Sequence, residues 1–398
     1  MSRITFAWEL GGGYGHINSF IPIAHQLFER GHSVSFLVKD LATAEALAGR
    51  YGFEAHQIPV HWQPDGKIPA AITYPQILLG CGFNFKNDLL ARVKALRRLF
   101  DWLQPELLIC DHAPTALVAA RSCAIPCALL GTGFFSPPKT SPMPSMRPWL
   151  NVPEQPLIAS EQRVLTTINE VFNELKIAPL ETLANLFDTE EDFLCTLPEL
   201  DHYQGRSEAR YWGPRFNVNE GVEPSWPISE KAKIFGYLSN AYSGLETLLQ
   251  QLRNSPFQVL MHVSGISPDL INKYTTENLQ LTNQPVKLAQ TGRHCDLVIC
   301  HGSHGTVAAA LLAGLPILAL PMHLDHFIIA RNINNHRLGA FIHPDNKKPH
   351  YRRAINQLLS EKIFNQEIKK FSSKYSEFHP DKQNDTIANR CEEIIARH

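Results

Sequence analysis

Apolar residues along the chain fall into short runs, and amphipathic stretches separate these runs. Residues 3–10 form an apolar run rich in β-branched and aromatic side chains, and a glycine-rich turn follows it. Apolar residues then recur along one helical face, at Ile17, Ile21, Ala24 and Phe28. Because proline is tolerated in a first turn, Pro22 predicts that this helix begins near residue 18 or 19. Residues 32–38 read as the next strand, so the order predicts a βαβ unit with parallel strands.

The same alternation continues through the first half of the chain. Residues 105–111 and 125–131 read as buried strands, and residues 161–190 read as helical. Residues 132–156 are too dense in proline and aromatic side chains for regular structure, so a long loop is expected there. Residues 211–230 are rich in Pro, Gly and Asn, which is typical of an interdomain linker.

A second series of strands and helices follows that linker. Strands are expected at residues 233–240 and 257–265, with a helix at 243–255 between them. Residues 295–321 read as strand, turn, helix and strand, and the chain from about residue 351 is helical and charged. The two series together predict two doubly wound α/β domains.

Composition narrows the class of protein further. The 398 residues exceed what one hydrophobic core normally supports, and 44% hydrophobic with 19% charged residues indicates a folded globular protein. A net charge of −1 gives no bulk attraction to nucleic acid or anionic membranes. No apolar run has the length of a membrane span, the N-terminus lacks a signal-peptide pattern, and the eight cysteines are scattered. We therefore expect a cytoplasmic protein with reduced thiols, no integral membrane segment and no nucleic-acid partner.

One glycine motif in the second half carries a specific chemistry. The strand 297–300 delivers His301 to its carboxyl end, Gly302 and Gly305 allow a close turn, and Thr306 opens a helix. Ligands of open α/β sheets bind at the carboxyl ends of strands. A helix N-terminus at that edge offers N–H groups and positive partial charge, which favours a phosphate. The motif therefore predicts a phosphate site, although a tight structural turn would need the same glycines.

Four stretches resemble the family 1 glycosyltransferases, which use nucleotide sugars and have the two-domain GT-B fold. "CDLVICHGSHGTVAAALLAGLPILALPMHLDHFIIARNINNHRLGA" is similar to the donor-binding signature of that family, and "GYGHINSFIPIAHQLFERGHSVSFL" to its N-terminal loop and first helix. "YWGP" and "IFGYLSN" resemble the family's linker and the strand that follows it. The resemblance implies two Rossmann-like domains that face each other across a cleft. Their implied bounds are 1–212 for the acceptor-binding domain, 213–230 for the linker, 231–375 for the nucleotide-sugar-binding domain, and 376–398 for a C-terminal helix that returns to the first domain.

The resemblance also implies a set of donor-binding residues. They are Gly13 and Gly15 in the first loop, Ser239 and Asn240 on a facing turn, Val286 beside the nucleobase, the turn residues His301, Gly302, Ser303, His304, Gly305 and Thr306, and Asp325 with His326 beside the sugar. Three positions depart from the family pattern. Ser303 replaces a glycine, Ala309 replaces a ribose-binding glutamate, and His326 replaces a glutamine. The nucleotide, UDP or dTDP, and the sugar therefore stay open.

The histidine that ends the first glycine turn is predicted to be a general base. In an inverting transfer an acceptor hydroxyl attacks the anomeric carbon, and a base must take its proton. The unperturbed pKa of histidine suits that task, and the loop places His16 at the carboxyl edge of the sheet. A carboxylate usually orients such a base, and Asp111, at the end of the strand 105–111, matches the family's partner residue. The alternatives are an exposed loop position for His16 and a helix N-cap role for Asp111.

The predictions about the acceptor and the cofactors rest on weaker sequence patterns. The loops 61–85 and 131–149 are rich in aromatic residues, Pro and Met, which favours an apolar or aromatic small-molecule acceptor. Five histidines could suggest a metal, but their spacing fits no common metal motif; they are His294, His301, His304, His323 and His326. The expectation is therefore a nucleoside-diphosphate sugar as co-substrate, with no cofactor and no metal. Within this reading, His304 and His326 contact the donor sugar and His294 is structural.

Two other functions are compatible with parts of the sequence. A dinucleotide-binding oxidoreductase would use the first glycine turn, with Asp40 at the end of the second strand binding a ribose. Against it, His16 stands where a third glycine is expected, and the second glycine motif stays unexplained. A non-catalytic nucleotide-sugar-binding protein would need neither His16 nor Asp111. The leading hypothesis is an inverting glycosyltransferase.

Overall fold

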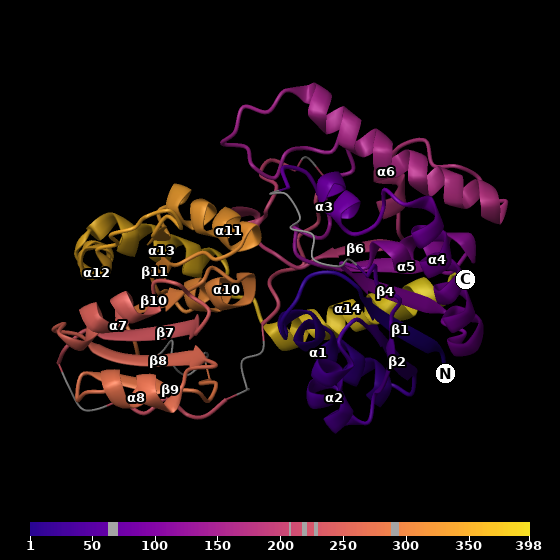
Figure 1. The fold of residues 1–398 in the computed structure, drawn as a ribbon. Coiled ribbons are helices and arrows are strands. Elements are labelled where there is room, and N and C mark those ends of the chain that lie inside the picture. Colours follow the sequence, from indigo (N-terminus) through magenta and orange to yellow (C-terminus); the bar gives the residue numbers. More distant parts are fainter. Residues whose placement is uncertain (63–70, 207, 217–220, 227–229, 288–293) are drawn as a thin grey trace. The chain divides into compact units, whose positions relative to one another are not determined.

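The computed structural model of the protein divides into two compact units. It describes residues 1–62, 71–206, 208–216, 221–226, 230–287 and 294–398. Unit 1 contains residues Met1–Leu197, His202–Gly213 and His379–His398, and unit 2 contains Pro198–Asp201 and Pro214–Phe378 (Figure 1). Each unit has its own sheet with helices packed against it, as the two series of strands and helices predict.

The sheet of unit 1 is parallel, and among the described residues it has six strands in the order β3-β2-β1-β4-β5-β6. Its strands are β1 (Arg3–Trp8), β2 (Ser33–Val38), β3 (Glu54–Gln57), β4 (Leu107–Asp111), β5 (Cys127–Gly131) and β6 (Glu191–Leu194). Strand β1 pairs with β2 on one side and with β4 on the other. The chain order reverses at β1, so the carboxyl ends of β1 and β4 form the place where such sheets bind ligands.

Helices cover both faces of this sheet. They are α1 (Gly15–Glu29), α2 (Leu41–Leu47), α3 (Tyr74–Gly80), α4 (Lys86–Leu103), α5 (Pro114–Ser122), α6 (Glu154–Leu175) and α14 (Pro380–Ile395). Successive strand residues point to opposite faces, so Phe6 and Trp8 belong to one buried cluster while Ala7 belongs to the other. Because both faces are buried, the central strands are largely apolar, which makes them recognisable in the sequence.

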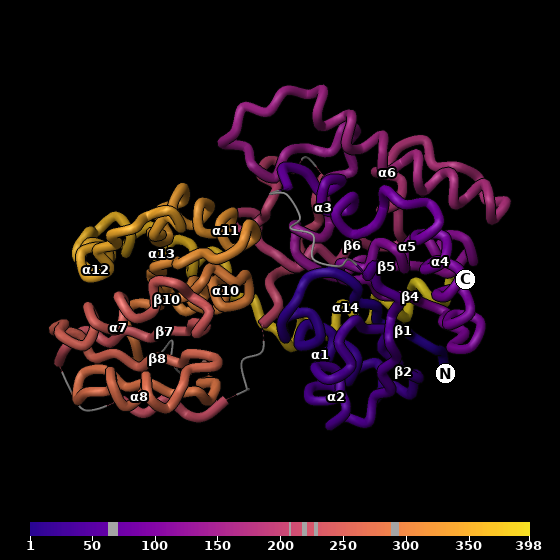
Figure 2. The backbone as a smooth tube through the Cα atoms, viewed as in Figure 1, coloured from indigo at the N-terminus to yellow at the C-terminus, as the bar shows by residue number. Residues whose placement is uncertain are grey.

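The last helix of the chain packs beside the first. Figures 1 and 2 show α14, in yellow, next to α1, in indigo. Ile387 and Ile394 lie in the same buried cluster as Ile17 and Phe20. At the edge of this contact, Arg30 donates hydrogen bonds to Asn389, Asp385 and Glu392 of α14. Unit 1 is therefore built from both ends of the chain.

Unit 2 repeats the architecture with its own parallel sheet, ordered β12-β11-β10-β7-β8-β9 over the described residues. The strands are β7 (Lys233–Ser239), β8 (Gln258–Ser264), β9 (Leu279–Thr282), β10 (Leu297–Cys300), β11 (Ile317–Ala319) and β12 (Gly339–Phe341). The helices are α7 (Leu245–Arg253), α8 (Pro268–Tyr274), α10 (His304–Leu312), α11 (Leu324–Asn335), α12 (Tyr351–Ser360) and α13 (Lys362–Lys374). The chain order reverses between β10 and β7, so the carboxyl ends of these two strands form the corresponding ligand edge.

Two helices, α1 and α6, have other bounds than the sequence predicts. Helix α1 begins at Gly15, not near residue 18 or 19, and Pro22 lies inside it. The first backbone bond of this helix runs from the Asn18 N–H to the Tyr14 carbonyl, so the glycine turn, and not the proline, sets its start. The helix expected at 161–190 is instead α6, which ends at Leu175 and is followed by a short 3₁₀ turn, Leu183–Phe187. The predicted loop is irregular up to residue 153.

Candidate functional site

The structure joins the two residues predicted to form a catalytic pair. Asp111 is the last residue of β4, and His16 lies in the first turn of α1, beside the carboxyl end of β1. His16 Nδ1 and Asp111 Oδ2 are 2.8 Å apart, and both side chains are buried. Helix α5 has Ala113 at its N-cap position, without a side-chain cap bond. The carboxylate of Asp111 therefore holds His16, and neither the N-cap reading of Asp111 nor the exposed-loop reading of His16 describes the structure.

Aromatic side chains and a glycine fix the orientation of the His16 ring. The ring stacks on Trp8 at 5.1 Å between centroids, and Phe135 packs against it at 5.0 Å. Gly11 adopts a φ of +82°, and a Cβ at this position would stand 2.7 Å from His16 Nε2. Any other residue would thus be strained and would crowd the ring nitrogen that Asp111 leaves unused. The predicted donor-binding glycines, Gly13 and Gly15, lie in the open part of the same turn.

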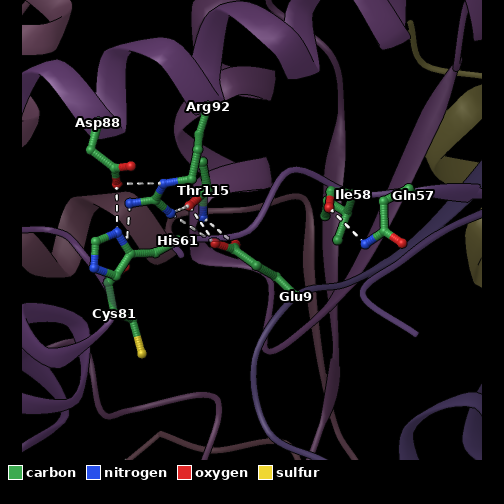
Figure 3. A network of polar contacts seen from close by, with 8 residues as sticks. All are labelled: Glu9, Gln57, Ile58, His61, Cys81, Asp88, Arg92 and Thr115. Carbon is green, nitrogen blue, oxygen red and sulfur yellow. Dashed lines mark hydrogen bonds and ion pairs between the residues drawn. The ribbon is translucent and has the colours of Figure 1, made fainter. Parts of the chain in front are cut away.

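A buried ionic network anchors Glu9, which lies two residues before the first glycine of the turn (Figure 3). Glu9 accepts hydrogen bonds from the Thr115 N–H at 2.8 Å and from Arg92 Nη1 at 3.1 Å. Arg92 also donates to Thr115 Oγ1, to Asp88 and to the Cys81 carbonyl, and Asp88 contacts His61 Nδ1 at 2.9 Å. Burial raises the pKa of Glu9, while the charge of Arg92 lowers it.

Sequence reasoning missed this network. Its signal in the sequence is a glutamate near the end of the apolar run 3–10, and the partners of this glutamate lie far along the chain. The network attaches the start of the glycine turn to α4 and α5, which supports the position of His16.

In unit 2, His301 lies where the sequence predicts it, at the carboxyl end of β10, but its nitrogens bind protein groups. Nε2 accepts the N–H of Ser239 at 2.8 Å, and Nδ1 lies 2.9 Å from the Leu320 carbonyl, to which it donates. Burial lowers the pKa of His301 to about 4, so the ring is neutral near pH 7. The imidazole therefore joins three strand ends, and in this arrangement it has no N–H left for a phosphate.

The turn after His301 has the form of an anion-binding helix start. Gly302 has a φ of +93°, and a Cβ there would stand 2.8 Å from the His326 carbonyl oxygen. Ser303 is the N-cap residue of α10, its hydroxyl donates to Thr306 Oγ1, and the first backbone bond of the helix runs from Val307 to Ser303. The N–H groups of Gly305 and Thr306 precede that bond and point out of the helix end. Gly305 lets the Arg215 carbonyl approach closely.

Val286 and Ser239 lie at two further positions of the predicted donor site. Val286 forms a parallel bridge with Val222, in which the Val222 N–H binds the Pro285 carbonyl and the Lys287 N–H binds the Val222 carbonyl. This geometry directs the N–H and carbonyl of Val286 to the opposite side, and neither has a partner within the described residues. Ser239 is the last residue of β7 and Asn240 follows it, and the Asn240 N–H binds the Ser264 carbonyl. Leu288, two residues after Val286, lies outside the described residues.

The histidines of unit 2 form a partly buried group beside this turn. The His326 ring lies 6.1 Å from that of His301 and 5.3 Å from that of His323. Burial lowers the pKa of His326, and it lowers the pKa of His304 to about 4. Asp325 lies in the first turn of α11, and its carboxylate is 3.8 Å from His326 Nε2. The structure thus gathers His301, Gly302, His304 and His326 at one edge, while His294 is exposed in a turn that precedes β10.

Other interpretations of the sequence can be compared with the structure. Asp40 is the N-cap residue of α2, and its carboxylate accepts the Thr43 N–H and hydroxyl, so it is occupied and not directed to a ribose. Within the described ranges, no group of three or more His, Cys, Asp or Glu side chains has an arrangement that could hold a metal ion. None of the described helices combines the length and apolarity that crossing a membrane requires. Residues 63–70 of the first predicted acceptor loop lie outside the described residues.

The buried neutral state of His301 makes unit 2 sensitive to acid. A pKa of about 4 in the folded state, against 6.5 for an unperturbed histidine, means that folding favours the neutral ring. The contribution of the neutral His301 ring to the free energy of unfolding is complete above about pH 6.5. It is lost as the pH falls through about 4, because a protonated Nε2 would face the Ser239 N–H. We expect thermal unfolding of the full chain to show this loss. A His301→Asn variant should show a smaller pH dependence, and an equal dependence would contradict the assignment.

Comparisons with known proteins agree with this fold. The chain is 23% identical over 331 residues to an uncharacterized glycosyltransferase of Methanosarcina mazei, which covers 78% of each chain. It is 24% identical over 400 residues to the zeaxanthin glucosyltransferase of Pantoea ananas, which covers 90% of this chain and 89% of the relative. The solved structure of glycosyltransferase VinC in complex with dTDP matches with a TM-score of 0.72 at 15% identity, over 100% of both chains. A scan against protein-family models finds no match.

These findings define the class of the protein. Two parallel sheets of the observed order are the GT-B architecture, and the chain is a glycosyltransferase with that fold. Within the class it is similar to family 1 enzymes, whose motifs at the N-terminal loop and at the His301 turn are present in the chain. The resemblance to family 1 glycosyltransferases that the sequence indicates is therefore confirmed.

Proposed function

We propose that the protein is an inverting glycosyltransferase that moves a sugar from a nucleoside diphosphate to a hydroxyl group, with His16 as the general base. The observation that supports this most directly is the buried contact of 2.8 Å between His16 Nδ1 and Asp111. A carboxylate on Nδ1 fixes the tautomer in which Nε2 carries the lone pair, and it stabilises the imidazolium that forms after proton transfer. A protein that only binds nucleotide sugars would not need this arrangement.

The reaction then has a simple balance of atoms. The acceptor oxygen forms a bond to the anomeric carbon, and the bond from that carbon to the diphosphate breaks. The proton of the acceptor hydroxyl passes to His16 Nε2, and the two electrons of the broken bond leave with the diphosphate. Asp111 keeps the Nδ1 proton hydrogen bonded throughout. Attack from the face opposite the leaving group inverts the anomeric centre.

In this proposal unit 2 binds the donor. The N-terminus of α10 offers the N–H groups of Gly305 and Thr306 to the diphosphate, where a helix end favours negative charge. The outward N–H and carbonyl of Val286 provide a backbone edge for a nucleobase. His301 supports the site by holding the Ser239 N–H. VinC was solved with dTDP, so a thymidine or uridine diphosphate is the first donor class to test.

The acceptor is proposed to be an apolar or aromatic small molecule with a hydroxyl group. Phe135, from the loop after β5, packs directly against His16, and the buried Tyr74 begins α3 in the other predicted acceptor segment. The relative named zeaxanthin glucosyltransferase has an apolar acceptor by its name, which agrees with such surroundings. Charged acceptors would lose hydration at these aromatic side chains.

Nucleotide binding provides the first test of the proposal. A thermal-shift series with UDP, dTDP, GDP and NAD should raise the melting temperature for one of the first three and not for NAD. A His301→Ala variant should bind that nucleotide more weakly, because the Ser239 segment loses its anchor. Stabilisation by NAD alone would favour the oxidoreductase hypothesis and would contradict the proposal.

Transfer is expected to proceed without an added divalent metal. The reason is that the N-terminus of α10 can take the charge that develops on the leaving diphosphate. Activity measured in EDTA should therefore equal activity measured in Mg²⁺. Loss of transfer in EDTA that Mg²⁺ or Mn²⁺ restores would show that a metal carries this charge instead.

A further inference from the structure

His112, the residue that follows Asp111, has an unusual position that the proposed reaction does not yet use. Its φ is 46°, in the left-handed region that residues other than glycine seldom adopt. The Leu10 N–H binds its carbonyl at 2.9 Å, which ties it to the start of the glycine turn. Its side chain is only 6% exposed. The backbone therefore holds a buried imidazole immediately beside the His16 and Asp111 pair.

Both ring nitrogens of His112 are buried, and neither has a hydrogen-bond partner in the part of the chain that the structure describes. Burial lowers the pKa of His112 well below the usual value, so the ring is neutral near pH 7. A neutral imidazole has one N–H donor and one acceptor nitrogen. Buried polar groups are almost always paired, so an imidazole with two unpaired nitrogens at a ligand edge indicates a polar group of a ligand.

The geometry directs this ring to the same place as His16. The position that a Cβ on Gly11 would take lies 2.7 Å from His16 Nε2 and 3.6 Å from His112 Nδ1. The two nitrogens therefore approach the same side of Gly11. Their separation cannot exceed the sum of these two distances, a span that one oxygen can bridge with two hydrogen bonds of ordinary length.

Aromatic side chains enclose both rings. His112 stacks on Phe135 at 4.4 Å between centroids, and Phe135 also contacts His16. Tyr74 packs on His112 at 5.8 Å. Two polar nitrogens inside an apolar wall match an acceptor that has one hydroxyl on an apolar or aromatic skeleton.

We propose that His112 binds the acceptor hydroxyl and orients it toward His16. In this arrangement the N–H on Nδ1 of His112 donates to the acceptor oxygen, and the hydroxyl hydrogen of the acceptor points to His16 Nε2. His112 keeps its proton throughout, so it positions the nucleophile and takes no part in proton transfer. This inference rests on the proposed function, because it assigns the acceptor subsite of the same reaction.

The test compares three variants with the wild type. His112→Phe keeps an aromatic ring but removes the hydrogen bond, whereas His112→Asn keeps an N–H donor and tolerates a positive φ well. His56→Phe replaces a half-buried histidine on the edge strand β3 and serves as the matched control. The probes are para-nitrophenol and para-nitrobenzyl alcohol, with UDP-glucose and dTDP-glucose as donors. Steady-state kinetics give KM for each substrate, and donor hydrolysis is measured without an acceptor.

The expected result is a rise of about tenfold or more in the acceptor KM for His112→Phe, the effect of one lost hydrogen bond. The donor KM and donor hydrolysis should be unchanged, His112→Asn should recover most of the affinity, and His56→Phe should behave as the wild type. An unchanged acceptor KM in His112→Phe, or an equal loss of donor binding, would overturn the inference.

A second measurement separates this inference from the proposed function. If the wild type transfers no sugar from either donor to either probe, the proposed function fails with these substrates. Binding of para-nitrophenol, followed by the change in its visible absorbance, then decides the inference without turnover. Weaker binding to His112→Phe than to His56→Phe and the wild type supports the acceptor subsite, and equal binding to all three overturns it.

Discussion

Replacement of His16 by alanine should slow sugar transfer by about 10²–10⁴-fold while nucleotide binding stays nearly unchanged. An alcohol near neutral pH is a weak nucleophile, and removal of the base leaves water as the proton acceptor. His16 belongs to unit 1, whereas the groups proposed to bind the diphosphate belong to unit 2. The loss should therefore fall on kcat, and a nucleotide titration by calorimetry should give the wild-type affinity.

Two companion variants sharpen this experiment. Asp111→Asn should slow sugar transfer less than His16→Ala does. The His16 ring and its Nε2 remain in this variant, and only the stabilisation of the imidazolium by the carboxylate is lost. His25→Ala is the control, since His25 lies on the same helix with a side chain that is 41% exposed. Wild-type turnover in His16→Ala with a true acceptor would exclude His16 as the base. A matching loss in His25→Ala would point to a damaged helix instead.

Replacement of Arg92 by methionine should destabilise unit 1 by about 3–5 kcal/mol, the usual effect of removing one partner from a buried ion pair. Arg92 and Glu9 are buried, and loss of the guanidinium leaves Glu9 with the donors of Thr115 alone. Methionine retains the apolar stem that packs near Phe83, so the variant mainly removes charge and hydrogen bonds.

Urea unfolding followed by tryptophan fluorescence measures this effect. Five of the six tryptophans lie in unit 1, so the signal reports mainly on that unit. The control is Lys86→Ala. Lys86 lies on α4, as Arg92 does, and the change breaks its exposed ion pair with Glu174 of α6. The control should unfold almost as the wild type does. If both variants unfold alike, the buried network adds no more stability than a surface pair does.

The sequence predicted the fold well because its strands are buried on both faces. Apolar runs such as residues 107–111 and 297–300 have no polar alternation and stand out from their surroundings. The His16 and Asp111 pair was also predictable, because Asp111 ends a recognisable strand and His16 directly follows the glycine turn. The GT-B fold followed from the order of these motifs.

Other features could not be read from local patterns. The bonds of His301 to Ser239 and Leu320 depend on which strands become neighbours, and no single stretch of sequence records that order. The Glu9 network joins residues up to 106 positions apart. The proposed role of His112 cannot be read from the sequence, because it depends on a backbone angle and on two ring nitrogens that have no hydrogen-bond partner among the described residues. Long-range contacts of polar side chains therefore limit what sequence patterns can reveal.

The position of α14 in unit 1 has a consequence for the synthesis of the chain. Ile387, Ala388 and Ile394 complete the buried cluster around α1, although about 370 residues separate them from Ile17 and Phe20. During translation the part of α1 that α14 covers therefore stays exposed until α14 leaves the ribosome, by which time all of unit 2 has been made. A released chain that stops before Pro380 should be cleaved by protease in unit 1 and be protected in unit 2. Equal protection of both units would mean that unit 1 closes its core without α14.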